Sequence, residues 1–350
     1  MLAGVAAKRL LLVVGVVLVA LLVVGLVRGA IGSAILKSEP LIPRPQIHLP
    51  PQPVFPASSR ELHLGLTSEP SEHGSEVDAH PADDHPDGAA DEHGEGESEG
   101  HGEAHATPLA VTEFAITNTM LSAWFATIVI ILFFVLGAGK KSLVPGRFQS
   151  VIESLFEAII NFSSAVLGPG MARKAFPIVA TIFFFVLFNA WLGLLPVYQF
   201  LGFVGADDNL IKVHLLRPAG TDLNMPLALA LVSFVFVEVW GFKAHGFGYL
   251  TKFFAFGSII KKGPFQGLID VFVGLLELVS ELIRVVSFTF RLFGNMTAGE
   301  ILVVMITFLV PLVATNFVYG LELLVGLIQA VIFAGLTLVF LSVAVSHQEH

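Results

Sequence analysis

The sequence predicts an all-α polytopic membrane protein with about six membrane-embedded helices and one amphipathic surface helix. Composition is the first reason, because hydrophobic residues make up 55 % of the 350 residues and charged residues only 13 %. The mean hydropathy of +0.80 is also typical of membrane proteins. The second reason is that apolar runs recur along the chain, most of them near the roughly 20 helical residues that span a bilayer core of about 30 Å.

The first expected element is an apolar helix over residues 10–27, within an N-terminal segment 1–37. Two basic residues precede it and Arg28 closes it. The run is longer than the roughly 7–15 apolar residues of a secretory signal peptide, so we expect a retained membrane helix. Signal-peptidase cleavage at the small residues 32–34 is the alternative. Both interpretations place the next segment outside the cytoplasm.

Residues 38–110 form a proline-rich and then acidic, histidine-rich segment. Residues 71–105 carry 12 Asp or Glu, six His and no Lys or Arg, so removing those 12 charges from the net −9 leaves +3 for the rest. Too little apolar surface is present to offset chain entropy, and we expect a disordered extracytoplasmic tether. Metal binding by the histidines is the alternative. They lack helical i, i+4 spacing and the chain has no cysteine, so no metal site is predicted.

Residues 111–350 are expected to form one membrane domain. Lys and Arg cluster before the first span, around 140–174 and around 243–262, and these clusters alternate with the tether and a polar loop at 198–221. Under the positive-inside rule, six crossings with both termini cytoplasmic satisfy this alternation. Before the last two helices, the expected elements are a span at 114–136, an amphipathic surface helix at 149–167 and spans at 175–197 and 222–240.

The fifth span, beginning near Gly267, contains an arginine. Arg291 lies within an apolar run from 271 to 313. A guanidinium has a pKa above about 12 and stays charged at any cellular pH. At a bilayer centre it costs about 2.5–3.5 kcal/mol on insertion scales, so an intramembrane charge is by default a functional-site hypothesis.

Other polar residues share the face of Arg291. Residues seven apart on a helix lie about 20° apart in azimuth, which aligns Glu277, Arg284 and Arg291. Glu281 lies three residues before Arg284, the spacing of an i, i+3 ion pair. The polar residues that also join this ladder are Ser280, Ser287 and Asn295.

Glu300 lies nine residues after Arg291, about 180° around the helix, so it is not expected to be the partner of Arg291. On the last span, 317–345, Glu322 and Gln329 are seven residues apart and share a face. Glu300 and Glu322 are expected to line a second polar passage in the outer half of the membrane. A carboxylate from another chain is the expected partner of Arg291, since a nearby cation lowers the pKa of an acid by about 1–3 units.

The stretch Arg291-Leu-Phe-Gly-Asn-Met-Thr-Ala-Gly-Glu300 resembles the signature of subunit a of F-type ATP synthases. The last helix is similar to that family too, with Gln329-Ala-Val-Ile-Phe seven residues after Glu322. Weaker similarities occur at 144–149 and 217–224. The resemblance covers residues 107–347 and leaves out the N-terminal helix and the tether.

The resemblance implies a proton-translocating stator subunit whose last two helices form a long tilted hairpin on the c-subunit ring. It implies two offset half-channels separated by Arg291. It also implies the peripheral-stalk b subunits and other synthase subunits as further partners, and a location in the cell inner (plasma) membrane. Bacterial relatives often have histidine at the position of Glu322. The implied essential arginine is Arg291, and its implied polar neighbours are Ser287, Asn295 and Gln329. Glu300 and Glu322 would lie in the outer half-channel. Asp222 would lie at a channel mouth and Glu277 in the cytoplasmic half-channel.

The sequence contains no Gly-x-x-x-x-Gly-Lys-Ser/Thr phosphate loop and no Ser/His/Asp set, so no catalytic residue, cofactor or nucleic-acid partner is predicted. The alternative function is a self-contained secondary transporter in which Arg291 binds an anionic substrate. No internal repeat is visible, which argues against an inverted-repeat transporter.

Overall fold

A computed structural model describes residues 2–37, 40–42, 51–57, 59–60, 115–138, 146–204, 211–246, 248–249, 253 and 264–346. The described chain is almost entirely helical, with two two-stranded antiparallel sheets, which confirms the predicted all-α polytopic class. By length and composition, four of its helices can cross a membrane, or five if a bent N-terminal pair is one span. The helix that carries Arg291, α9, is not among them.

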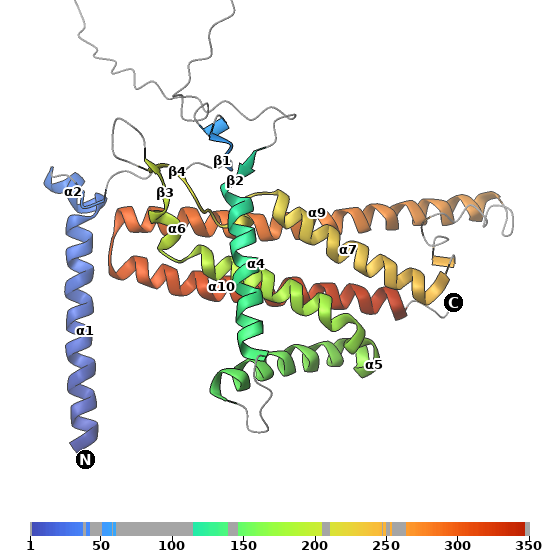
Figure 1. Ribbon diagram of the computed structural model, residues 1–350, viewed down its shortest axis with the longest axis horizontal. Coiled ribbons are helices and arrows are strands. Elements are labelled where there is room, and N and C mark those ends of the chain that lie inside the picture. The colour runs from blue at the N-terminus through green and yellow to red at the C-terminus, as the bar shows by residue number, and fades with distance from the viewer. Residues whose placement is uncertain are drawn as a thin grey trace, which may run out of the picture.

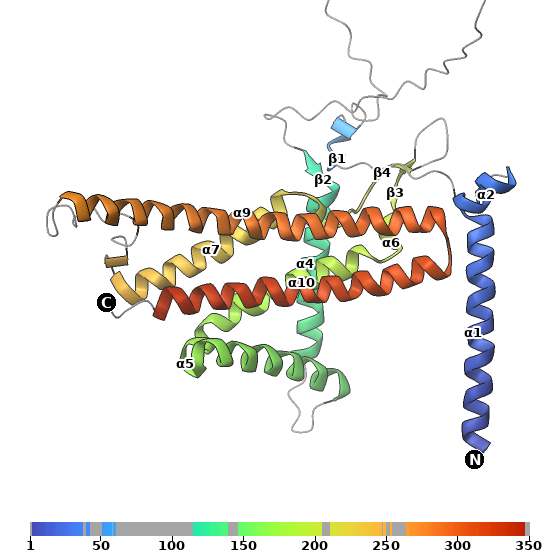
Figure 2. The ribbon, with the colours of Figure 1, turned by 180° about the vertical axis from the view of Figure 1, so that it is seen from behind.

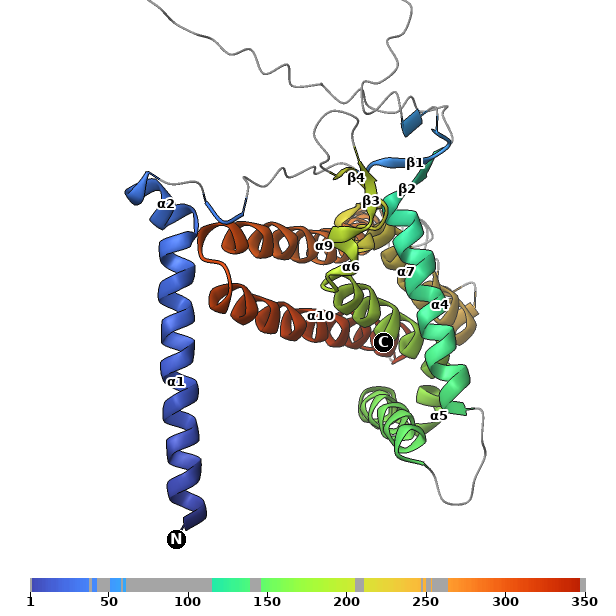
Figure 3. The same ribbon diagram turned by 60° about the vertical axis from the view of Figure 1, so that its left-hand side comes forward.

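The N-terminal helix α1 (Leu2–Arg28) follows from the uninterrupted apolar run. It is succeeded by the short helix α2 (Ala30–Leu36), and the two are bent by 57°. Helix α1 lies at the end of the molecule where the last two helices turn (Figures 1 and 3). Close packing there requires glycine, because a Cβ on Gly25 would lie 2.2 Å from the carbonyl oxygen of Pro311.

Helix α4 (Asn118–Ala138) is the predicted second span, and α5 (Arg147–Gly193) contains the next two predicted elements. Gly168 interrupts α5 with φ 74° and ψ 160°, a conformation that glycine adopts without a Cβ clash. Pro169 follows, and its missing N–H also disfavours a continuous helix. The predicted surface helix and the predicted third span are therefore the two arms of α5.

The predicted polar loop at 198–221 is largely ordered. It contains the short helix α6 (Val197–Phe200), strands β3 (Gly202–Val204) and β4 (Ile211–His214), and the 3-10 helix η1 (Ala219–Thr221). Helix α7 (Asn224–His245) follows as the predicted fourth span.

Part of the segment predicted as a disordered tether is also ordered. Strand β1 (Pro53–Phe55) pairs with β2 (Ile116–Thr117), and Val54 is fully buried. Disorder is therefore the wrong prediction for residues 53–55, because their pairing partner lies more than sixty residues away and composition does not reveal it. Residues 61–110 lie outside the described residues. Both sheets gather at the same end of α4 (Figures 1 and 3).

The last two helices, α9 (Pro264–Leu309) and α10 (Val313–Ser346), form the predicted hairpin. Helix α9 has 46 residues and is therefore about 70 Å long, against a bilayer core of about 30 Å, so it must be strongly inclined in a membrane. Both helices lie across α4 in Figure 1. Figure 2 shows the opposite face of the hairpin, which no described helix covers.

Helices α5 and α7 pack on the covered side of the hairpin through two apolar clusters. Their most buried members come from α5, α7, α9 and α10, and include Val179, Ile182, Ala230, Leu292, Phe333 and Leu338. This packing holds α9 and α10 side by side and brings their polar residues together.

Candidate functional site

Arg291 lies on α9 with its side chain partly exposed. Within the described chain it forms no ion pair, and the ring of Phe288 lies 5.8 Å from its guanidinium carbon. Ser287 and Asn295, four residues before and after it, are exposed. Positions four apart share a helix face, so this stripe of α9 is open to a partner.

Asn295 joins the two helices of the hairpin one turn beyond Arg291. Its side-chain amide donates a hydrogen bond of 2.8 Å to Oε1 of Gln329 on α10. Gln329 is 2 % exposed, and its amide nitrogen has no hydrogen-bond partner among the described residues. The structure thus brings together two predicted site residues that are 34 positions apart.

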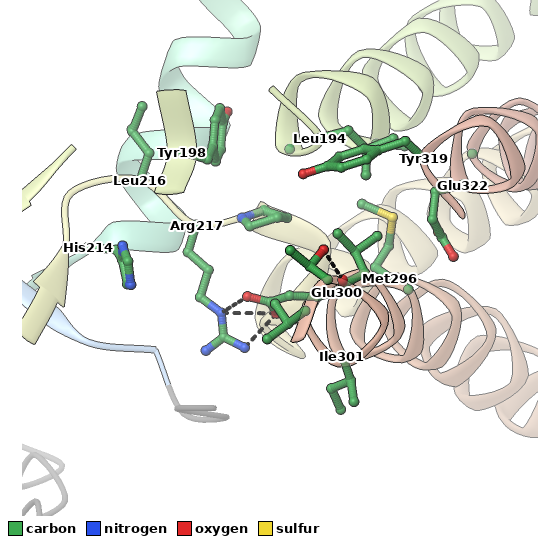
Figure 4. A pocket seen from close by; sticks show the side chains of 18 of the residues that line it. Leu194, Tyr198, His214, Leu216, Arg217, Met296, Glu300, Ile301, Tyr319 and Glu322 are labelled. Atoms are coloured by element: carbon green, nitrogen blue, oxygen red, sulfur yellow. Dashed lines mark hydrogen bonds and ion pairs between the residues drawn. The ribbon is translucent and has the colours of Figure 1, made fainter. Parts of the chain in front are cut away.

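A cavity of about 570 Å³, here called the large cavity, lies beyond Asn295 on α9. Burial raises the pKa of Tyr198, one of its lining residues, to about 12, so that hydroxyl stays protonated at cellular pH. Figure 4 shows the acidic side of the cavity, with Glu300 and Glu322 on neighbouring helices. The cavity brings together four predicted site residues: Asn295, Glu300, Glu322 and Gln329.

Glu300 has a partner that the sequence did not indicate. Nη2 of Arg217 donates to Oε2 of Glu300 at 2.8 Å, and Nε lies 3.2 Å and 3.3 Å from its two carboxylate oxygens. The side chains of Arg217 and Glu300 are 7 % and 28 % exposed, so this forked ion pair is largely withdrawn from water. The helix-geometry prediction that Arg291 is not the partner of Glu300 is confirmed. The only signal for Arg217 was its place at the start of the weaker 217–224 similarity.

Glu322 is half-buried against the backbone of α9. A Cβ on Gly299 would lie 2.3 Å from Oε2 of Glu322, so the missing side chain at 299 makes room for this carboxylate beside Glu300. Glycine has no Cβ, and here that absence serves close approach rather than an unusual backbone angle.

Asp222 is only 8 % exposed and does not line the large cavity. Its Oδ2 accepts a hydrogen bond of 2.8 Å from Thr119 on α4, and its Oδ1 accepts one of 3.1 Å from the backbone N–H of Asn224. Asp222 therefore ties the residues just before α7 to α4, and it lies one position ahead of Leu223, the N-cap of α7.

A second cavity of about 330 Å³, here called the small cavity, lies on the other side of Arg291 along α9. Arg284 pairs with Glu281 and lies 3.7 Å from the ring centre of Phe340, so the predicted i, i+3 pair is confirmed. Among the described residues, the polar lining of the small cavity belongs to α9 and consists of Glu277, Ser280, Glu281 and Arg284. Arg291 lines neither cavity and lies between them in sequence and on the helix.

Tyr249 lies close to the small-cavity acids. Its hydroxyl donates to Oε1 of Glu238 at 3.5 Å. Burial, together with the nearby carboxylates of Glu238 and Glu281, raises the pKa of Tyr249 far above its usual value. The phenol is therefore a neutral donor beside these acids. In the part of the chain that the structure describes, no three His, Cys, Asp or Glu side chains form a group that would hold a metal ion.

A sequence model of the family described as "ATP synthase A chain" matches residues 120–342. The chain belongs to this family. It is 33 % identical over 223 residues to ATP synthase subunit a of Sulfurihydrogenibium sp., which covers 64 % of this chain and 94 % of the relative. ATP synthase subunit a of Cereibacter sphaeroides is 34 % identical over 243 residues, 67 % of this chain and 83 % of the relative. Family membership and the apolar spans make the chain a multi-pass membrane component of an ATP synthase.

Proposed function

We propose that this chain is the proton-translocating stator subunit of the membrane sector of a rotary F-type ATP synthase. The observation that carries the proposal is the position of Arg291. It lies on α9 between two polar cavities, without a carboxylate partner among the described residues. A permanent cation in this position is suited to meet an acid supplied by another chain.

The proposed partner is the c-subunit ring, which would face the uncovered side of the hairpin seen in Figure 2. Exposed apolar residues of α9 surround the open stripe, including Ile283, Val286 and Phe290. These apolar side chains are suited to packing against transmembrane helices or lipid. The peripheral-stalk b subunits and the other synthase subunits complete the proposed set of partners.

Ion transfer would follow from the charges of the two cavities. A ring carboxylate that reaches Arg291 loses its proton more readily, because a cation within about 4–6 Å lowers its pKa by 1–3 units. The guanidinium does not itself release a proton, so it blocks direct leakage between the cavities. The large cavity, with Glu300 and Glu322, would form one half-channel, and the small cavity, with Glu277, would form the other.

The proposed orientation follows from the positive-inside rule. Both termini and the basic connections would be cytoplasmic, and residues 38–110 would lie outside the cytoplasm of an inner (plasma) membrane. The large cavity would then open to the outside, since its lining includes Gln52 and His214, which belong to the end of the molecule where the two small sheets lie (Figure 3). The chain would conduct ions and leave ATP chemistry to other subunits.

Replacing Arg291 with Ala tests the proposal in the purified complex reconstituted into vesicles. We expect ATP-driven proton pumping to be abolished. The matched control is Arg284→Lys, on the same face seven residues earlier, which keeps a cation beside Glu281. Coupled pumping at the normal rate by Arg291→Ala would overturn the proposal. Transport of an anionic solute by the chain purified alone would point instead to a self-contained transporter.

A further inference from the structure

The N-terminal extension, residues 1–60, lies outside the part of the chain that matches the family, yet it reaches the large cavity. Ile42 and Gln52 belong to the residues that line this cavity, together with Asn118 and Arg217. Gln52 is 3 % exposed and Val54 is fully buried, so this part of the extension is packed into the protein.

Two backbone hydrogen bonds of Gln52 hold the extension to the start of α4. Its N–H donates to Oδ1 of Asn118 at 3.2 Å, and its carbonyl oxygen accepts from the N–H of Asn118 at 3.0 Å. Strand β1 then continues this attachment by antiparallel pairing, with Pro53 opposite Thr117 and Phe55 opposite Ile116. The extension thus docks by strand addition, in which main-chain hydrogen bonds provide the attachment.

A continuous series of buried contacts leads from this attachment to Glu300. The carbonyl oxygen of Asn118 accepts from the hydroxyl of Ser122 at 3.0 Å, and that hydroxyl accepts from the backbone N–H of Arg217 at 2.9 Å. Arg217 in turn holds Glu300 at 2.8 Å. Asn118, Ser122 and Arg217 are at most 6 % exposed, so water cannot readily replace a lost partner.

A second contact fixes the far end of the docked segment. The guanidinium of Arg60 lies 4.0 Å from the ring centre of Phe203 on β3, in cation–π geometry. Strand β3 pairs with β4, which ends at His214, and His214 also lines the large cavity. The segment is therefore attached to α4 near Gln52 and to β3 near Arg60.

We propose that residues 51–57 of the extension, through Gln52, form one side of the large cavity and that the backbone of Gln52 positions Arg217 against Glu300. Asn118 and Ser122 transmit this position and are positioning residues. The consequence for ion entry rests on the function proposed above. The proposal that the extension closes one side of the cavity does not depend on that function, because it concerns only the packing of the extension and the access of solutes to the cavity.

Cysteine cross-linking tests the docking of the extension directly, because the chain contains no cysteine of its own. In the assembled complex, Pro53→Cys and Thr117→Cys occupy partner positions and should form a disulfide on mild oxidation. Pro53→Cys with Thr127→Cys, which lies farther along α4, should not. Failure of the first pair to cross-link would overturn the docking of β1.

Access to the cavity is measured with a reporter cysteine at Val304, which lines it. Gln52→Pro removes the N–H that bonds Asn118, whereas the control Phe55→Ala, at an exposed position of β1 outside the cavity lining, keeps both backbone bonds of Gln52. A membrane-impermeant thiol reagent should label the reporter at least about tenfold faster in Gln52→Pro, because a lost backbone bond opens this side of the cavity. Equal labelling rates in Gln52→Pro and in the control would show that the extension does not restrict access to the large cavity.

Pumping by the same variants tests positioning. We expect Gln52→Pro to slow ATP-driven pumping several-fold and Phe55→Ala to pump normally. In an Arg217→Gln background, Gln52→Pro should cause no further loss, since Gln52 and Arg217 act in one series. Additive losses would overturn the positioning role. The labelling rate does not depend on pumping. If labelling contradicts the role of the extension while Arg291→Ala still abolishes pumping, the proposed function of the chain stands.

Discussion

The large and the small cavity are built in different ways although both hold an arginine–glutamate pair. The pair of the large cavity, Arg217 and Glu300, joins residues 83 positions apart, and the cavity lining includes residues of α4, α5, α9 and α10, of the 214–218 segment and of the N-terminal extension. The pair of the small cavity, Glu281 and Arg284, is one helical turn long, and the lining residues that the structure describes there all belong to α9 and α10. One cavity therefore depends on the whole fold and the other on a single hairpin.

Breaking the long-range pair should have the largest effect. Arg217→Leu leaves the partly buried carboxylate of Glu300 without its cation, and removing one partner of a buried pair costs about 3–5 kcal/mol. We expect loss of most ATP-driven pumping and weaker assembly of the complex, measured by proton uptake and co-purification. Arg217→Leu with Glu300→Leu should restore assembly without pumping. Normal pumping by the single variant would contradict the comparison.

The next effect should come from filling the space that Glu322 occupies. Gly299→Ala places a methyl group 2.3 Å from the present position of Oε2, so the carboxylate must move. Ala is favoured over Gly in a helix by about 1 kcal/mol, so slower pumping would reflect displacement rather than a weaker helix. We expect a several-fold lower initial pumping rate. Gly320→Ala on α10, where a Cβ meets no atom within 4 Å, should pump normally.

Breaking the local pair should matter less. The Glu281–Arg284 pair lies within one helix, so Arg284→Leu breaks no ion pair between distant segments, although Glu281, whose side chain is 6 % exposed, loses its cation. We expect a normally assembled complex with reduced pumping, and near-normal pumping from Arg284→Lys. A loss of assembly as severe as that of Arg217→Leu would show that the small cavity also depends on the wider fold.

The smallest effect is expected at the edge of the small cavity. Tyr249→Phe removes a hydrogen bond to the carboxylate of Glu238 that is long at 3.5 Å, so its contribution should fall below the about 1.5–3 kcal/mol typical of hydrogen bonds to charged groups. We expect a slightly lower temperature of thermal dissociation of the complex and unchanged pumping. A large change in pumping would make Tyr249 part of the ion path.

Local patterns predicted much of this fold. The apolar runs gave the spans, Gly168-Pro169 separates the two predicted elements of α5, and the i, i+3 spacing gave the Glu281–Arg284 pair. The Arg217–Glu300 pair and the order of residues 53–55 were not predicted. Both depend on residues far apart in sequence, and no periodicity within one segment records such a meeting.

By itself, the sequence determined which residues are apolar enough for a membrane, and it placed Arg291 and its polar ladder on one face of a helix. These properties follow from composition and the 3.6-residue period, which act over a few neighbouring residues. Only the tertiary structure decided that Glu300 pairs with Arg217, that Asn295 bonds Gln329, and that β1 docks beside the large cavity. The physical reason is that buried polar groups need partners, and the packing of distant segments determines which partners are within reach.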